Sequence, residues 1–290
     1  IMGKFLGTII TVFYTIIFLL ANILFATIFI EILDVALFPL TPTWFNTILA
    51  FITCAYISYK GLTGLSRFGE VVVPIIIGMT FFLVLLGIHN FDFGELLPIM
   101  SDSTFKEINI GAINSTFTFA DILILIMMTP NLKNKKDLNK IFINATVFST
   151  LMVTILIVAT QLALGVEYTK HANFPFLIYT RIISIGETYG FDSLYIGIWI
   201  IGNIMKISIY LYFTTIALEK LTKKSNKLFI IPVSILLTVI TIYIKDRRPL
   251  LPLAIEINSI IRLLIILAVV AVPTIMLIVY FFRRKKLKNN

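Results

Sequence analysis

The sequence contains very few of the residues that catalytic and metal sites use most. Cys54 is the single cysteine among 290 residues, and the two histidines, His89 and His171, are far apart along the chain. A disulfide framework and a thiolate metal site are therefore excluded. No HExxH motif, Walker-type glycine loop, GxSxG motif or paired-carboxylate pattern occurs. We expect neither an enzyme nor a bound cofactor.

Charged residues are scarce as well. Only 13% of the chain is charged, 59% is hydrophobic, and the mean hydropathy is +1.00. These values exclude an ordinary soluble domain and predict an all-α polytopic membrane protein. The net charge of +9 does not indicate nucleic-acid binding, because the basic residues fall in short clusters between apolar runs, as topology signals do.

The apolar runs predict eight membrane spans, since about 20 apolar residues cross the hydrocarbon core. They cover approximately residues 8–30, 43–59, 70–88, 117–130, 141–164, 193–218, 228–244 and 260–282. Of the 24 Lys and Arg residues, 16 fall on one side of this topology and 6 on the other. The positive-inside rule then predicts that both termini of this chain are cytoplasmic, and an even number of spans agrees with it.

The run at 194–218 carries the motif WIIGNIMKISIYLY, with a lysine near its middle. A lysine at this depth costs roughly 2.5 kcal/mol or more to insert, so it normally faces a partner or a watery cavity. Trp199, Asn203, Lys206 and Tyr210 are four, three and four residues apart, which places them on one helical face. The stripe favours a helix that lines a ligand site. A lysine that snorkels, or that pairs with a buried acid for structural reasons, is the alternative.

The run at 117–130 is short, and polar residues precede it. Only about a dozen residues separate its start from Thr129 and Pro130, and Asp121 lies near that start. Such a segment is typical of the broken helices of secondary transporters, where exposed backbone groups coordinate substrate. The positive end of a half-helix favours anions such as an amino-acid carboxylate. A short, tilted helix with an outer cap is the alternative.

Asp121 is the candidate charge partner of Lys206. Phe119, from the same short segment, and Asn22, an amide within the first span, complete the candidate ligand-binding residues. The outer segment 165–190 is too long for a plain loop and predicts one or two short helices that start at Pro175. It forms either a lid over an outward cavity or an inert cap.

Nine stretches in this chain resemble those of one known family. They are TPTW at 41–44, YKGLTGLSRFGEV at 59–71, LLP at 96–98, the Asp121 helix with Thr129-Pro130, KNKK at 133–136, LGVE at 164–167, FPFLIYTRIISIGE at 174–187, WIIGNIMKISIYLY at 199–212 and VPTIMLIVYFFRRKK at 272–286. The stretches cover nearly all of the chain, and in their order and spacing the chain resembles the B subunits of endospore germinant receptors. These are the spore germination permeases of the amino acid–polyamine–organocation superfamily.

The resemblance implies a leucine-transporter-like fold of ten spans, built as two inverted five-helix repeats with substrate between helices one and six. With eight spans present, we expect one integral membrane domain over residues 1–290 that lacks the first two spans. Either the sequence is a piece of a longer protein, which we favour, or the gene is truncated. Lys206 then lies on helix eight, where its ammonium would stand in for the sodium ion of sodium-coupled relatives, and segment 165–190 matches the external lid.

The resemblance also implies a function. We expect a receptor subunit in the inner membrane of a dormant spore that senses a small nutrient, most simply an amino acid, together with A and C partner subunits. A proton-coupled amino-acid transporter, in which Lys206 cycles protons, is the first alternative. A non-functional remnant that lacks two helices is the second. The lipid bilayer is the other expected partner, and nucleic acid is not expected.

Overall fold

The computed structural model describes residues 3–97, 103–116, 121–132, 137–247, 264 and 267–287. Its contacts divide the chain into two compact units. The first unit holds residues 1–68, 117–130 and 203–290, and the second holds residues 69–116 and 131–202. Helices α3 (Gly61–Leu86) and α9 (Asp192–Thr222) contribute residues to both.

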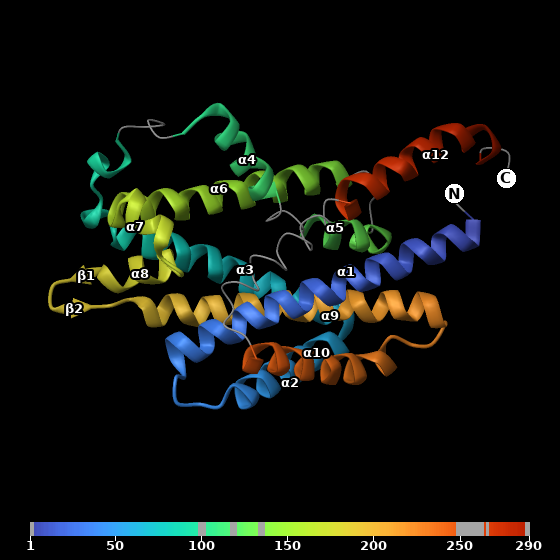
Figure 1. Ribbon diagram of the computed structural model, residues 1–290, viewed down its shortest axis with the longest axis horizontal. Helices are drawn as coiled ribbons and strands as arrows, with labels where there is room; N and C mark the ends of the chain where they lie inside the picture. Colours follow the sequence, from blue (N-terminus) through green and yellow to red (C-terminus); the bar gives the residue numbers. More distant parts are fainter. Residues whose placement is uncertain are drawn as a thin grey trace. The chain divides into compact units, whose positions relative to one another are not determined.

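The first unit is built from long apolar helices. Besides its parts of α3 and α9, its elements are α1 (Gly3–Ile32), a π-helical turn (Leu33–Leu37), α2 (Thr43–Tyr59), α5 (Ile122–Met128), a 3-10 turn (Thr129–Asn131), α10 (Lys227–Arg247), a second π-helical turn (Leu267–Ala271) and α12 (Val272–Leu287). Helix α10 packs against α2 and α1 (Figure 1), and α5 packs against the second π-helical turn. Residues such as Phe18, Tyr210 and Phe213 are almost fully buried and form the core between α1 and α9.

The second unit is organised around α6 (Leu138–Leu164). Its other elements are two 3-10 turns (Ile88–Asn90 and Phe93–Leu96), α4 (Phe105–Thr116), α7 (Val166–His171), α8 (Pro175–Ile182) and the antiparallel strands β1 (Ser184–Ile185) and β2 (Thr188–Tyr189). Helix α6 packs against α7, α8 and both turns. Gly165 ends α6 with a φ of 81°, a conformation that an L side chain rarely adopts.

A buried tyrosine ties α8 to the end of α3. Tyr179 is fully buried, and its hydroxyl donates to the carbonyl oxygens of Val84 at 3.0 Å and Leu83 at 3.3 Å. Its ring lies against Gly87, where a Cβ atom would be 2.5 Å from Tyr179 Cζ. The end of α3 therefore needs a residue without a side chain at this position.

Among the residues that the structure describes, five helices are long and apolar enough to cross a membrane. They are Phe5–Leu37, Gly61–Leu86, Leu138–Leu164, Asp192–Thr222 and Lys227–Asp246. Two further apolar helices, Ile122–Asn131 and Leu267–Phe282, are shorter, and α2 has 17 residues. The chain is therefore an α-helical membrane protein, as expected. The count of eight spans, the inverted repeats and the single domain over 1–290 stay predictions.

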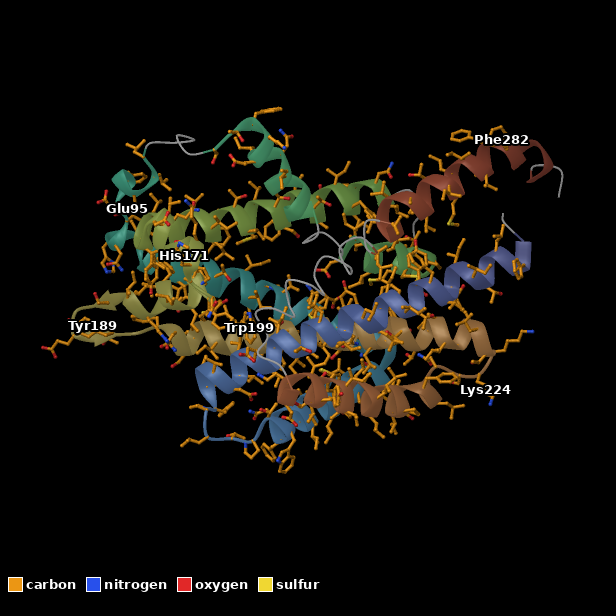
Figure 2. The ribbon with its side chains drawn as sticks, viewed as in Figure 1. Glu95, His171, Tyr189, Trp199, Lys224 and Phe282 are labelled. Atoms are coloured by element: carbon orange, nitrogen blue, oxygen red, sulfur yellow. The ribbon has the colours of Figure 1, made fainter. Side chains whose placement is uncertain are left out.

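Segment 165–190 contains two short helices, of which α8 is the one that the sequence predicts and α7 lies before Pro175. Helix α8 begins at Pro175, which occupies the first turn as expected. The β1–β2 hairpin was not expected, and Tyr189 projects from it with 74% of its surface exposed (Figure 2). Arg181 pairs with Asp192, with 3.0 Å between Nε and Oδ2. Whether the segment acts as a lid stays a prediction.

Candidate functional site

The two charges expected to meet within the membrane do meet. Lys206 lies 14 residues after the start of α9 and 16 before its end, and its Nζ donates to Oδ2 of Asp121 at 3.1 Å. Tyr210, one turn further along the same face, donates its hydroxyl to Oδ1 of Asp121 at 2.7 Å. Both carboxylate oxygens are therefore hydrogen-bonded by α9.

Asp121 reaches α9 from the N-terminal end of the short helix α5. It is the N-cap residue, but its side chain makes no capping hydrogen bond, because its oxygens bind Lys206 and Tyr210 instead. Helix α5 is only seven residues long, which agrees with the short segment expected here. The sequence predicts an anion site at the N-terminal end of this short helix. In the structure the carboxylate of Asp121 lies at that end and supplies the negative charge there.

Phe25 of α1 is a member of this cluster that sequence reasoning missed. The Nζ atom of Lys206 lies 3.9 Å from the centre of the Phe25 ring, within the range of a cation–π interaction. The Phe25 ring also lies 5.0 Å from that of Tyr210. The Lys206 ammonium of α9 thus contacts the Asp121 carboxylate at the start of α5 and the face of the Phe25 ring of α1.

The Asp121–Lys206 pair is only partly covered. Its side chains are 47% and 32% exposed respectively. Exposed charges at the middle of a span are costly against lipid, so this surface faces water, a ligand or other protein. Part of each charged side chain is therefore accessible from that surface.

Asn22 lies in the α1–α9 interface, one turn before Phe25. It is fully buried, its Nδ2 donates to the carbonyl oxygen of Ile207 at 3.4 Å, and its Oδ1 has no hydrogen-bond partner among the described residues. A buried acceptor without a donor costs about 1–3 kcal/mol. Asn22 therefore joins α1 to α9 next to the charged cluster and keeps one acceptor unused.

The remaining candidates are placed less centrally. Asn203 is half-buried one turn before Lys206, and Trp199 is half-buried one turn earlier still, on the part of α9 that belongs to the second unit. Both take part in contacts. Phe119 lies outside the described residues. The structure thus joins Asp121, Lys206 and Tyr210 directly.

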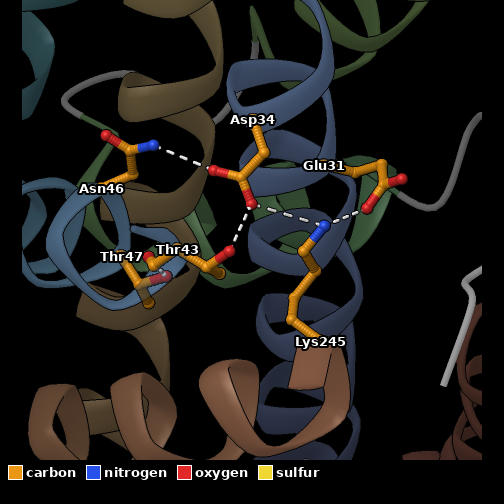
Figure 3. A network of polar contacts seen from close by, with 6 residues as sticks. All are labelled: Glu31, Asp34, Thr43, Asn46, Thr47 and Lys245. Carbon is orange, nitrogen blue, oxygen red and sulfur yellow. Dashed lines mark hydrogen bonds and ion pairs between the residues drawn. The ribbon is translucent and has the colours of Figure 1, made fainter. Parts of the chain in front are cut away.

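A second charged network lies at the end of α1 and in the π-helical turn that follows it, six to nine residues beyond Phe25, and was not expected as a unit (Figure 3). Lys245 of α10 pairs with Glu31, and its Nζ lies 3.5 Å from Oδ2 of Asp34. Asp34 also accepts from Thr43 Oγ1 at 2.8 Å and from Asn46 Nδ2 at 2.9 Å. Three helices are tied at this end of the first unit, and the Lys245 side chain is only 11% exposed.

Neither cluster is a metal centre. In the described part of the chain, no three His, Cys, Asp or Glu side chains converge to hold a metal ion. Each carboxylate in the two clusters has a lysine ammonium as its cation.

Comparison with known proteins gives the family. Residues 1–249 match the profile of the family described as Spore germination protein. Spore germination protein KB of Bacillus subtilis (strain 168) is 25% identical over 195 residues, which are 64% of this chain and 51% of that protein. Spore germination protein GerQB of Bacillus cereus is 25% identical over 252 residues, 86% of this chain and 68% of that protein.

A third relative, spore germination protein YndE of Bacillus subtilis (strain 168), is 23% identical over 236 residues, 77% of this chain and 62% of that protein. This chain thus spans about half to two thirds of the length of these relatives. No solved structure matches it. The match over residues 1–249 shows that this membrane protein belongs to the spore germination protein family.

Proposed function

We propose that this chain is part of a germinant receptor subunit that senses a small zwitterionic nutrient, most simply an amino acid. The site is the cluster of Asp121, Lys206, Tyr210 and Phe25. The observation that carries this proposal is the partly open ion pair at the middle of α9. Membership of the germination family supports the role, because its relatives are named as spore germination proteins.

An amino acid matches this pair charge for charge. Its ammonium replaces the Lys206 ammonium on the carboxylate of Asp121 and faces the ring of Phe25. Its carboxylate then binds Lys206, as charge-assisted hydrogen bonds favour. The internal pair is therefore exchanged for two pairs to the ligand, and no charge in the span is left without a partner.

The exchange provides a signal. In the unliganded protein, Asp121 holds α5 against α9 through Lys206 and Tyr210. A ligand between Asp121 and Lys206 removes their direct contact, so it stabilises a conformation in which α5 and α9 are farther apart. A ligand shifts the population only as far as its affinities for the two conformations differ. Partner A and C subunits in the spore inner membrane would detect the shift, with both termini of this chain in the cytoplasm.

A proton-coupled transporter is the second candidate, because an accessible lysine–carboxylate pair within a span is also suited to proton exchange. Reconstitution separates the two. The full-length protein is placed in liposomes, with and without its partner subunits, and is offered a panel of radiolabelled amino acids. Saturable binding without accumulation supports the sensor. Accumulation that depends on a proton gradient identifies a transporter and contradicts the proposal.

A further inference from the structure

Five lysines gather where α2 ends and where α9 turns into α10. They are Lys60, Lys220, Lys223, Lys224 and Lys227, and all are exposed. Lys224 extends from the turn between α9 and α10 (Figure 2). We call this group, with Tyr56 and Tyr59 of α2, the lysine–tyrosine patch.

The two tyrosines hold two of these ammoniums in place. The Nζ atom of Lys227 lies 4.7 Å from the centre of the Tyr59 ring, and that of Lys60 lies 4.9 Å from the centre of the Tyr56 ring. Tyr56 and Tyr59 are three residues apart on α2, so the rings share one face. A cation–π contact orients an ammonium and leaves its charge unneutralised. The end of α2 and the start of α10 therefore present positive charge together.

No carboxylate balances this charge among the described residues. None of the five lysines forms an ion pair with a described residue, whereas Lys170, Arg181 and Lys245 do. Glu219 is the acid nearest in sequence to the α9–α10 turn, and its Oε2 accepts the backbone N–H of Asn226 at 3.2 Å. The patch can therefore take a phosphate group without first breaking a salt bridge.

An apolar groove runs from the patch along the same two helices. It has a volume of about 460 Å³ and lies between the faces of α2 and α10 that carry Ile48, Ile52, Ile231, Ile235 and Val239. The helices are antiparallel here, since α10 begins at Lys227 beside Tyr59, the last residue of α2. From Tyr59 to Ile48 a helix rises about 16 Å, roughly half the thickness of the hydrocarbon core.

We propose that the patch and the groove together bind one anionic phospholipid. The lysines, two of them oriented by the tyrosine rings, hold the headgroup phosphate, and an acyl chain lies in the groove. Charge complementarity and the continuity of the patch with an apolar groove favour a phospholipid over a soluble anion, which would use the patch alone. Tyrosine suits the boundary between headgroups and hydrocarbon, and each lysine near an anionic lipid surface strengthens binding.

The test measures lipid retained by the purified full-length protein in native mass spectrometry, with phosphatidylglycerol and phosphatidylcholine offered in equal amounts. The patch variant is Lys60→Gln with Lys227→Gln. The groove variant is Ile235→Trp, which fills the groove and keeps the charge. The control is Lys140→Gln, an exposed lysine outside the patch.

We expect wild type and Lys140→Gln to prefer phosphatidylglycerol, and the patch variant to lose about tenfold or more of that preference. The groove variant should retain less of either lipid. Equal retention of the two lipids by wild type, or an equal loss in Lys140→Gln, overturns the proposal. If the patch variant keeps its preference for phosphatidylglycerol, the assignment of the patch to lipid is wrong.

Discussion

Neutralising Lys206 and Asp121, singly and together, tests how strongly α5 is held to α9. The variants are Lys206→Met, Asp121→Asn and the double substitution. The atoms Nζ and Oδ2 are 3.1 Å apart. Two unit charges at this distance attract by roughly 5 kcal/mol at an effective dielectric constant of about 20. Because the side chains are 32% and 47% exposed, solvent screens the pair and reduces this attraction.

We therefore expect a coupling energy of about 1–3 kcal/mol, above that of surface pairs and below the cost of breaking a fully buried pair. Each single variant leaves one charge within the span without its partner. The double variant leaves none, so it should be less destabilised than the sum of the two single variants. The coupling corresponds to a factor of about 5 to 150 in an equilibrium constant.

The sequence contains its own reporter for this measurement. Cys54 is fully buried between α2 and α9, with its Sγ 3.6 Å from the carbonyl oxygen of Ile204. A thiol reagent reaches it only when α9 separates from α2, so labelling reports how far the contact between Asp121 and Lys206 stabilises the packing of α9 in the first unit. Where reclosing is faster than reaction, the ratio of labelling rates gives the change in opening free energy. Labelling at Cys54 is followed by peptide mass spectrometry.

The control is Lys140→Met on α6, where the lysine is exposed and the described residues offer it no ion pair. This variant should label at the wild-type rate. A coupling energy below about 0.5 kcal/mol in the Lys206–Asp121 cycle would refute the reasoning. Substitutions at two residues that stabilise each other should have non-additive effects, whereas those at independent residues add. So would single variants that label as slowly as the control.

Three further predictions concern stability. Lys245→Met leaves two carboxylates without their cation and should lower the free energy of unfolding by about 2–4 kcal/mol. Its control, Asp246→Asn at an exposed neighbour, should change that free energy by less than about 0.5 kcal/mol, and equal costs would contradict the prediction. Gly87→Ala, just after the end of α3, should cost about 1–3 kcal/mol by overpacking. Gly78→Ala, within α3, should be neutral or stabilising because a Cβ there meets nothing within 4 Å, and the reverse order in a thermal melt would contradict the prediction. Burial raises the pKa of Tyr179 to about 12, so its contribution to stability is complete below the ordinary value of about 10 and is lost as the pH rises through 12. The absorbance difference between wild type and Tyr179→Phe should titrate near that pH, and a midpoint near 10 would contradict the burial.

The pairing of Lys206 with Asp121 was predictable because each charge is costly in an apolar segment and needs a partner. Tyr210 followed from its spacing of four residues after Lys206. Phe25 gave no such signal, because it is one of 25 phenylalanines and an apolar residue is unremarkable in a span. Only the crossing of α1 over α9, which sequence periodicity does not encode, places its ring against the Lys206 ammonium.

The other differences have similar causes. The expected topology places Glu31, Asp34 and Lys245 on the same side of the membrane. Counting charges assigns that side, but it does not predict a contact between residues that are 211 or more apart in sequence. The hairpin at Ser184–Tyr189 has strands of two residues each, too short to show the alternation that predicts a strand. Its turn glycine, Gly186, has a φ of 59°.

The central claim is that a zwitterion exchanges with the Asp121–Lys206 pair, and equilibrium binding tests it most directly. Radiolabelled amino acids are offered to the full-length protein with the proposed A and C subunits, as wild type, Lys206→Met and Lys140→Met. The account predicts saturable binding of an amino acid by wild type and by Lys140→Met. In Lys206→Met, Kd should rise at least about tenfold, since a charge-assisted hydrogen bond contributes about 1.5–3 kcal/mol. The matching amine and the matching acid, each with one of the two charges, should bind more weakly. Unchanged binding by Lys206→Met would contradict the account.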